Sequence, residues 1–340
     1  MPEAVIVTVT GASGYIALHV IAQLLDDGHA VRGTLRDMSR AEPLRAALSR
    51  QTEISNLTFV QADLTSDVGW DAAMAGSDFV MHVASPVPIV EPKDYDELIA
   101  PARDGTLRVM EAAAKAGVKR VVMTSSNAAV NSGHGGKSSF TEADWSVLGD
   151  GTGAYASSKT IAERAAWDFV AGLPDDQVME LVAINPCVVL GPLIDPDGSA
   201  SIELIRKLVA HEVPGCPNLG FTIVDVRDVA AAHVTAMTAP HAAGHRYLCT
   251  AEFRWVREIA QTLNQSVGQR GYPVSTRRLP DWLMRCVGVF DPAVRRFIPH
   301  LGERQDFDNN AIRRDLNWKP RPVEDSIVHT AESLIALGVV

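Results

Sequence analysis

Residues 5–17 of the chain read V-I-V-T-V-T-G-A-S-G-Y-I-A, and this stretch decides the fold. Its first half is rich in β-branched residues and predicts a buried strand, whereas the apolar residues that follow have helical spacing. Between the two, Gly11 permits a tight turn, Gly14 lets a pyrophosphate approach the backbone, and small Ala17 lets the helix pack closely on the strand. The free N–H groups at the helix start favour an anion. The stretch therefore predicts a dinucleotide-binding turn with contacts from Gly11, Ser13, Gly14, Tyr15 and Ile16.

The alternation of strand and helix continues to about residue 190. Helical spacing of apolar residues separates the short β-branched runs, several of which are apolar on both faces, as buried parallel strands are. We therefore predict an α/β fold, a Rossmann-type doubly wound parallel sheet whose ligand lies at the carboxyl ends of the strands. The predicted strands are 5–10, 31–35, 57–60, 79–84, 121–125 and 181–184, and the predicted helices are 16–25, about 107–116 and 154–171.

The length of 340 residues suggests two domains. After Pro192 the elements become shorter and are separated by Pro, Gly and charged residues, which predicts a smaller, mixed substrate-binding lobe. Residues 221–237 are an exception, because they run from a short strand into a helix and are expected to return to the first domain. The predicted dinucleotide-binding domain therefore comprises 1–191 and 221–250, and the discontinuous lobe comprises 192–220 and 251–340.

Composition excludes several classes of function. The net charge of −10 argues against a protein that binds nucleic acid or an anionic membrane, although residues 270–321 carry 11 Lys and Arg against six Asp and Glu. The four cysteines are far apart and form no C-x-x-C, so we expect neither a metal site nor disulfides. The chain has no apolar run of 18 residues, and a cytoplasmic location is the expectation. The choice between monomer and homodimer stays open.

The end of the second predicted strand indicates the type of nucleotide. Arg36 stands there, 22 positions after Gly14, where an NAD site would have an acid. A planar guanidinium suits the 2′-phosphate, so NADP(H) is the predicted cofactor, although neighbouring Asp37 leaves a solvated surface arginine as the alternative. Asp63 and Leu64, just after the third strand, are placed either to contact adenine or simply to end that strand.

A serine, a tyrosine and a lysine form the predicted catalytic set. Ser126 ends a strand, and Tyr155 and Lys159 lie four residues apart on a predicted helix, hence on one face. A phenol with a pKa near ~10 needs a nearby cation to act at neutral pH, and Lys159 can supply it. We expect Tyr155 to pass a proton to a substrate oxygen that Ser126 holds, while the nicotinamide supplies hydride. The Y-x-x-x-K pattern alone is common, but it gains weight after a glycine turn and a serine-ended strand.

These motifs together resemble the extended short-chain dehydrogenase/reductase superfamily, in particular its dihydroflavonol and cinnamoyl-CoA reductases. The similarity covers nearly the whole chain and includes T-G-A-S-G-Y-I-A at 10–17, H-V-A-S-P at 82–86, Y-A-S-S-K-T-I-A-E at 155–163, V-D-V-R-D-V-A at 224–230 and L-N-W-K-P-R-P at 316–322. The resemblance implies that Ser126 is the catalytic serine and that Ser201 reaches a phosphate. It also implies cofactor contacts from Val83, Ala84, Ser85, Thr124, Tyr155, Lys159, Pro186, Val188 and Val189.

Substrate choice is less well defined by sequence. The resemblance implies that an Asn five residues after the serine contacts substrate, so Asn131 either does so or is a satisfied loop amide, whereas Asn127 departs from the family pattern. The further candidates for substrate contact are Asn127 itself, Val87 and Phe221. The predicted function is an NADPH-dependent reductase of a small aromatic or hydrophobic aldehyde or ketone. The alternatives are a 3β-hydroxysteroid-type or sugar-nucleotide-type dehydrogenase or epimerase of the same fold, and a non-catalytic NADP(H)-sensing regulator.

Overall fold

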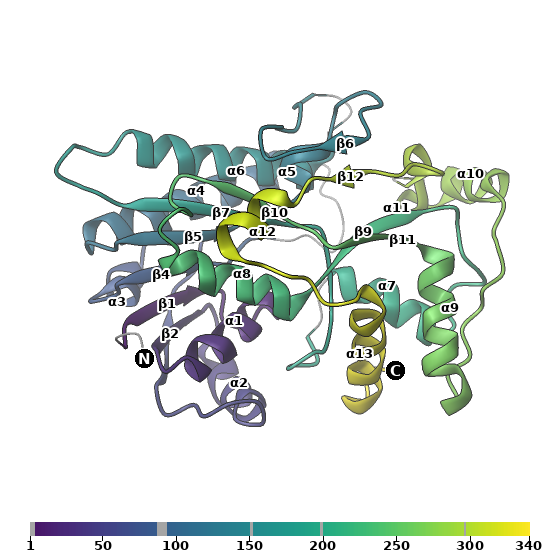
Figure 1. Ribbon diagram of the computed structural model, residues 1–340, viewed down its shortest axis with the longest axis horizontal. Coiled ribbons are helices and arrows are strands. Elements are labelled where there is room, and N and C mark those ends of the chain that lie inside the picture. Colours follow the sequence, from purple (N-terminus) through teal and green to yellow (C-terminus); the bar gives the residue numbers. More distant parts are fainter. Residues whose placement is uncertain (1–3, 87–93, 150–151, 198–199, 296) are drawn as a thin grey trace.

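A computed structural model describes residues 4–86, 94–149, 152–197, 200–295 and 297–340 (Figure 1). Its main feature is a sheet of seven strands in the order β10-β7-β5-β4-β1-β2-β3, all paired in parallel within these ranges. The order and direction are those of a Rossmann-type sheet, which confirms the predicted fold class. The strands are β1 (Ile6–Thr10), β2 (Ala30–Leu35), β3 (Leu57–Gln61), β4 (Phe79–His82), β5 (Arg120–Thr124), β7 (Glu180–Pro186) and β10 (Arg246–Cys249).

Helices cover both faces of this sheet, and the two faces have separate apolar cores. α1 packs against α8 on one face, and α4 packs against α6 on the other (Figure 1). The sequence predicts the sheet by its buried β-branched strands, such as β5, in which every residue is buried. The flanking helices are α1 (Tyr15–Asp26), α2 (Ala41–Leu48), α3 (Trp70–Met74), α4 (Asp96–Lys115), α6 (Ala154–Ala171) and α8 (Val226–Thr238).

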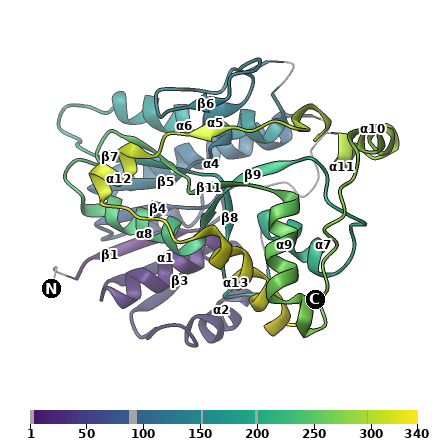
Figure 2. The ribbon, with the colours of Figure 1, turned by 45° about the vertical axis from the view of Figure 1, so that its right-hand side comes forward.

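A separate sheet of three strands, in the order β11-β9-β8, begins just after β7 leaves the main sheet. β8 pairs in parallel with β9, and β11 pairs antiparallel with β9. Helix α13 contacts both α7 and α9 beside this sheet (Figure 2). The remaining elements are α5 (Ala128–Asn131), β6 (Ser139–Phe140), β8 (Val188–Leu190), α7 (Ala200–Val209), β9 (Gly220–Asp225), β11 (Glu252–Trp255), α9 (Val256–Ser266), α10 (Asp281–Phe290), α11 (Pro292–Arg295), β12 (Asp306–Phe307), α12 (Asn310–Leu316) and α13 (Val323–Ala336), with 3-10 turns η1 (Met38–Arg40), η2 (Gly268–Arg270) and η3 (Ile298–His300).

The segment 221–250 contributes to both parts of the molecule. Strand β9 lies in the small sheet, whereas helix α8 packs on α1 and strand β10 forms the edge of the main sheet. One apolar core runs from α1 through α8 to α7, α9 and α13. The division into two discontinuous domains stays a prediction. No helix of the described ranges is long and apolar enough to cross a bilayer.

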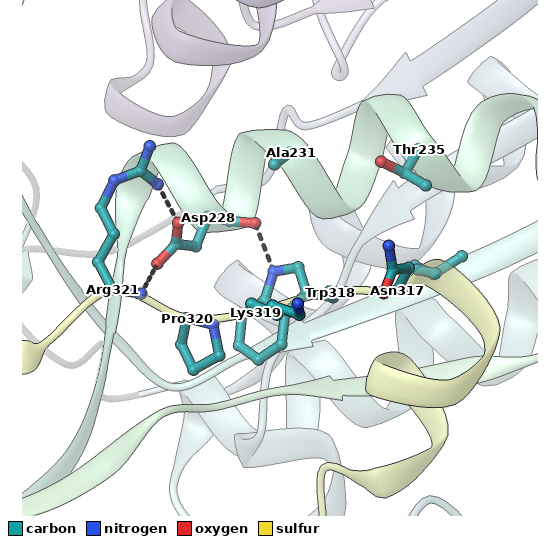
Figure 3. Close-up of a pocket in the computed structure, with 9 residues that line it drawn as sticks. Asp228, Ala231, Thr235, Asn317, Trp318, Lys319, Pro320 and Arg321 are labelled. Carbon is teal, nitrogen blue, oxygen red and sulfur yellow. Dashed lines mark hydrogen bonds and ion pairs between the residues drawn. The ribbon is translucent and has the colours of Figure 1, made fainter.

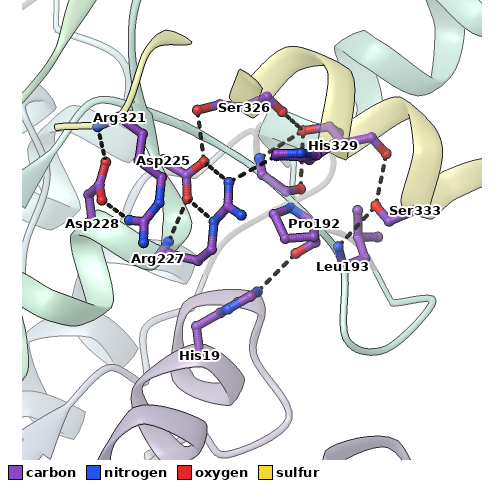
Figure 4. A network of polar contacts seen from close by, with 12 residues as sticks. His19, Pro192, Leu193, Asp225, Arg227, Asp228, Arg321, Ser326, His329 and Ser333 are labelled. Carbon is purple, nitrogen blue, oxygen red and sulfur yellow. Dashed lines mark hydrogen bonds and ion pairs between the residues drawn. The ribbon is translucent and has the colours of Figure 1, made fainter. Parts of the chain in front are cut away.

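Asp225, at the end of β9, ties the two parts together (Figure 4). Its carboxylate accepts hydrogen bonds from Arg227 N at 2.8 Å, from the Arg227 guanidinium at 2.7 and 2.8 Å, and from Ser326 Oγ of α13 at 2.8 Å. It thereby caps α8 and holds α13 against that helix. Burial alone would raise the pKa of Asp225, but the hydrogen bonds from Arg227 and Ser326 outweigh it and hold the pKa below its ordinary value.

The turn at 191–193 is fixed from two sides in the same region (Figure 4). Thr330 Oγ1 of α13 accepts from Gly191 N at 2.7 Å, and Ser333 Oγ accepts from Leu193 N at 3.0 Å. From α1, His19 Nε2 donates to Pro192 O at 2.9 Å. Burial lowers the pKa of His19 to about 4, so this ring is neutral and bonds without charge at neutral pH.

We predict that Asp225→Asn lowers the free energy of unfolding at pH 7 by about 1–3 kcal/mol, because a buried ionic hydrogen-bond acceptor is lost. The folded-state pKa of Asp225 is depressed, so its stabilisation is present above the unfolded pKa and disappears as pH falls through the folded one. Urea unfolding from pH 7 to pH 3 should therefore show the two proteins converging at acid pH. Glu332→Gln, which breaks the exposed pair with Arg270, is the control and should change little. A pH-independent difference would contradict this assignment.

Candidate active site

The glycine turn after β1 is pressed against the segment that follows β4. Gly11 has a φ of +66°, and a Cβ there would lie 2.9 Å from Ala84 Cα. Ala84 N donates to Thr10 Oγ1 at 3.0 Å, which holds the two segments together. The predicted cofactor residues Val83, Ala84 and Ser85 thus lie beside the turn. Only a residue without a side chain fits at position 11, as the sequence predicts.

The start of α1 leaves backbone donors available. Gly14 is the exposed N-cap residue in extended conformation, and within the described residues no side chain caps the helix. Ser13 and Ile16 are half-buried beside it. Tyr15 is buried instead, and its hydroxyl donates to Gly191 O at 2.8 Å. The Tyr15 side chain therefore fixes the 191–193 turn, and only its backbone faces the site where an anion would bind.

Arg36 lies exposed where β2 ends, as predicted. The carboxylate of Asp37, which could have competed as a ribose acceptor, instead accepts from Ser39 N at 2.9 Å and Ser39 Oγ at 2.7 Å and so caps η1. At the end of β3, hydrogen bonds from Thr65 lower the pKa of Asp63, and the nearby Arg36 charge adds to this effect. Asp63 and Arg36 are thus close to each other.

Sequence reasoning missed a second arginine in this area. Arg40 lies on η1 and pairs with Asp195 at 3.0 Å and with Asp197. Its position four residues after Arg36 was the sequence signal for a second cation near the end of β2. The pairing ties η1 to the segment that precedes α7 and Ser201, whose side chain is half-buried.

Ser126, Tyr155 and Lys159 meet at the carboxyl end of β5. Tyr155 is 37% exposed; burial raises the pKa of its phenol, and a hydrogen bond with Ser126 acts in the opposite direction. Ser126 Oγ also accepts from Ala128 N at 3.1 Å. Lys159 is 4% exposed, and its Nζ donates to Thr124 O at 3.4 Å. Burial lowers the pKa of Lys159 to about 8, while Glu163 acts in the opposite direction.

The remaining predicted residues have mixed surroundings. Asn127 N donates to Pro186 O at 2.9 Å, so the segment Pro186 to Val189 runs beside the serine loop. Asn131 Nδ2 donates to Gln305 Oε1 at 2.5 Å, so this amide is held by the chain itself. Phe221 is half-buried on β9 and packs edge to face with Phe297. Val87 lies outside the described residues.

A pocket elsewhere in the molecule contains none of the predicted residues (Figure 3). It lies between α8 and residues 316–321, which belong to the L-N-W-K-P-R-P motif. Trp318 Nε1 donates to Asp228 O at 2.9 Å, and Arg321 N donates to the Asp228 carboxylate at 2.7 Å. These bonds show that the motif braces α8. Among the described residues, no cluster of His, Cys, Asp or Glu could hold a metal ion.

The fold and the Ser–Tyr–Lys arrangement define a Rossmann-type nucleotide-binding protein. The model of the NAD dependent epimerase/dehydratase family matches residues 7–249, and the chain belongs to that family. This finding confirms the resemblance to extended short-chain dehydrogenases/reductases.

Individual relatives are reductases by name. Cinnamoyl-CoA reductase 1 of Arabidopsis thaliana is 36% identical over 99% of this chain and 91% of its own length. Anthocyanidin reductase ((2S)-flavan-3-ol-forming) of Vitis vinifera is 32% identical over 80% of this chain and 84% of its own. Among solved structures, yeast methylglyoxal/isovaleraldehyde reductase Gre2 complexed with NADPH has a TM-score of 0.81 at 26% identity, covering 98% of this chain and 100% of that one.

The close approach of Gly11 to Ala84 predicts that alanine lowers the free energy of unfolding more at Gly11 than at Gly28, although both glycines have a positive φ. Gly28→Ala meets no atom within 4 Å and should cost about 1 kcal/mol from its positive φ alone. Gly11→Ala has the same backbone strain and also forces Cβ against Ala84, which adds about 1–3 kcal/mol. Chemical unfolding of both variants measures the difference. Equal losses would show that the turn has room for a side chain.

Proposed function

We propose that this chain is an NADPH-dependent reductase of small aromatic or hydrophobic aldehydes and ketones, with Tyr155 as proton donor. The observation that carries the proposal is that Ser126 lies two residues after the end of β5, where Lys159 Nζ donates to Thr124 O at 3.4 Å, and that Tyr155 stands one helical turn before Lys159 on α6. This set lies at the carboxyl ends of the parallel strands, where ligands of such sheets bind. The reductase names of the relatives support the reaction class.

The residues present fit the proposed cofactor. Gly11 brings backbone against Ala84 with no space for a side chain, and the uncapped start of α1 offers N–H groups to a pyrophosphate. Arg36 is exposed at the end of β2, and Asp37 is engaged with Ser39, so a guanidinium rather than a carboxylate faces the ribose position. When bound, NADPH supplies the hydride.

The chain's own residues manage the proton. Lys159 is protonated below its pKa of about 8, and a cation one helical turn from Tyr155 would favour the ionised phenol, whose pKa burial raises. Ser126, which lowers the pKa of the Tyr155 phenol, holds the substrate oxygen next to that phenol. Tyr155 then donates its proton to that oxygen as the carbonyl carbon is reduced.

Apolar residues beside the set support a hydrophobic substrate. Val188 is half-buried on β8, and Phe221 is half-buried on the neighbouring strand β9. Val188 follows Pro186, whose carbonyl accepts from Asn127 N, and its partner on β9, Ile223, lies two residues after Phe221. Aromatic side chains such as Phe221 and Phe297 offer a surface to a ring-bearing substrate.

We predict that Tyr155→Phe lowers kcat for aldehyde reduction by about 10²–10⁴-fold, because it removes only the proton donor. The affinity for NADPH should change little, since the ring is kept. Loss of NADPH absorbance with a panel of aromatic aldehydes, α-keto esters and flavonoid ketones measures both proteins. Unchanged activity in the variant would eliminate Tyr155 as the acid. Tight NADPH binding by the parent without any turnover would favour a non-catalytic sensor.

Arg36→Ala should raise KM for NADPH by about 10–100-fold, because charge-assisted hydrogen bonds to a phosphate are lost. KM for NADH should stay nearly constant, since NADH has no 2′-phosphate. Arg50→Ala is a matched control, because Arg50 is also exposed but lies away from the end of β2. Equal changes for both cofactors would remove Arg36 from the phosphate site.

A further inference from the structure

Glu163 is a fully buried carboxylate on the same face of α6 as the catalytic pair. It follows Tyr155 by eight residues and Lys159 by four, so the three side chains stand on successive turns of the helix. Its relative exposure is 0%. A buried carboxylate is costly unless it is well bonded, so its partners show what it does.

The Glu163 carboxylate connects three strands of the sheet. Its Oε2 accepts from Ser125 Oγ at 2.5 Å, at the end of β5, and from Asn185 Nδ2 at 2.8 Å, on β7. Its Oε1 accepts from Arg246 Nε at 2.5 Å, on β10, and from Trp167 Nε1 at 3.3 Å, one turn further along α6. Four side-chain donors therefore surround the carboxylate.

The same network reaches the backbone of the catalytic serine. Asn185 Nδ2 also donates to Ser126 O at 3.1 Å. Ser125, bonded to Glu163, lies between Ser126 and Thr124, whose carbonyl accepts from Lys159. One carboxylate thus fixes the short stretch that positions both the serine and the lysine.

Arg246 forms an ion pair with Glu163, and its other contacts fix the guanidinium in place. Its side chain is 9% exposed, and Nη1 donates to Glu142 O at 2.9 Å and Asp144 O at 2.8 Å. Its guanidinium lies 3.6 Å from the centre of the Trp145 ring. With the arginine so fixed, the carboxylate stays near Lys159 while Lys159 Nζ points to Thr124 O.

The charges around Lys159 come from several elements. On α6 the charged neighbour is Glu163, and on β10 Arg246 acts through Glu163. On β4, His82 is fully buried, and burial together with the Lys159 charge lowers its pKa to about 3. His82 is therefore neutral, and its Nδ1 is bonded to Thr10 Oγ1 at 2.9 Å. Among these described neighbours, Glu163 supplies the negative charge that stabilises the ammonium.

We propose that the Glu163–Arg246 pair is a positioning device that holds the Ser125–Ser126 backbone and places a carboxylate one helical turn from Lys159 in the active site. The proposal rests on the proposed reductase function, since it assigns this pair to the same reaction. Neither residue touches substrate or cofactor in this account. Both act through Lys159 and Ser126.

The two members of the pair should have opposite effects on pH dependence. Glu163→Gln removes the negative charge, so Lys159 should lose its proton at lower pH, and the alkaline fall of kcat should move down by about 1 pH unit. Arg246→Gln leaves the carboxylate uncompensated, so the same fall should move up. A merely structural role predicts no such opposition, because each change breaks the same ion pair.

The experiment measures kcat for an aromatic aldehyde, and the dissociation constant of NADPH by fluorescence, from pH 6 to pH 10 in the parent and both variants. Opposite shifts of the alkaline midpoint in either quantity support the proposal. Midpoints that coincide with the parent's, or that move in one direction in both variants, would overturn it.

Two further variants keep the outcomes separable. If either single variant fails to fold, the double variant Glu163→Gln with Arg246→Gln restores a neutral, hydrogen-bonding pair, and its midpoint should lie below that of the parent because the nearest anion is gone. An unshifted midpoint in the double variant would overturn the proposal. The proposed reductase function fails on a different result, namely full activity of Tyr155→Phe.

Discussion

The burial of Lys159 is the constraint on which the arrangement of the site depends. A lysine that is 4% exposed loses hydration, and its pKa falls to about 8. The ammonium persists at neutral pH because a backbone carbonyl of β5 accepts from it and a buried carboxylate lies one turn away. That carboxylate requires an arginine in turn, and the arginine comes from the edge strand β10. The charge of Lys159 is thus linked, through Glu163, to side chains at the end of β5 and on the neighbouring strands β7 and β10.

Local patterns made the fold and the principal residues predictable. The strand–glycine–helix sequence at 5–17 determines its own structure, because the turn needs a positive φ at Gly11 and the helix needs small residues against the strand. The four-residue spacing of Tyr155 and Lys159 is equally local. These features were identified from the sequence because each depends on neighbours along the chain.

Contacts between distant residues escaped sequence analysis. Glu163 and Arg246 are 83 positions apart, and Asn131 and Gln305 are 174 apart. Nothing in the local pattern connects them, and Arg246 stands on a strand of only four residues that the sequence did not predict. The sequence alone also left the role of Asp37 undecided. In the structure its carboxylate caps the short turn η1, and the neighbouring Arg36 is exposed. The exposed arginine at the end of β2 was therefore predictable, but the buried ion pair beside Lys159 was not.

The smaller sheet and α13 complete the support of the site. Asp225 and the 191–193 turn join α8, α1 and α13 at the point where the chain leaves the main sheet. The central claim remains the transfer of hydride to a carbonyl within this frame. It is tested most directly with an aromatic aldehyde and NADPH in which both hydrogens on the hydride-donating nicotinamide carbon are replaced by deuterium, with the product analysed by mass spectrometry. The account predicts an alcohol with deuterium on the former carbonyl carbon. An alcohol without the label, or no alcohol at all, would contradict it.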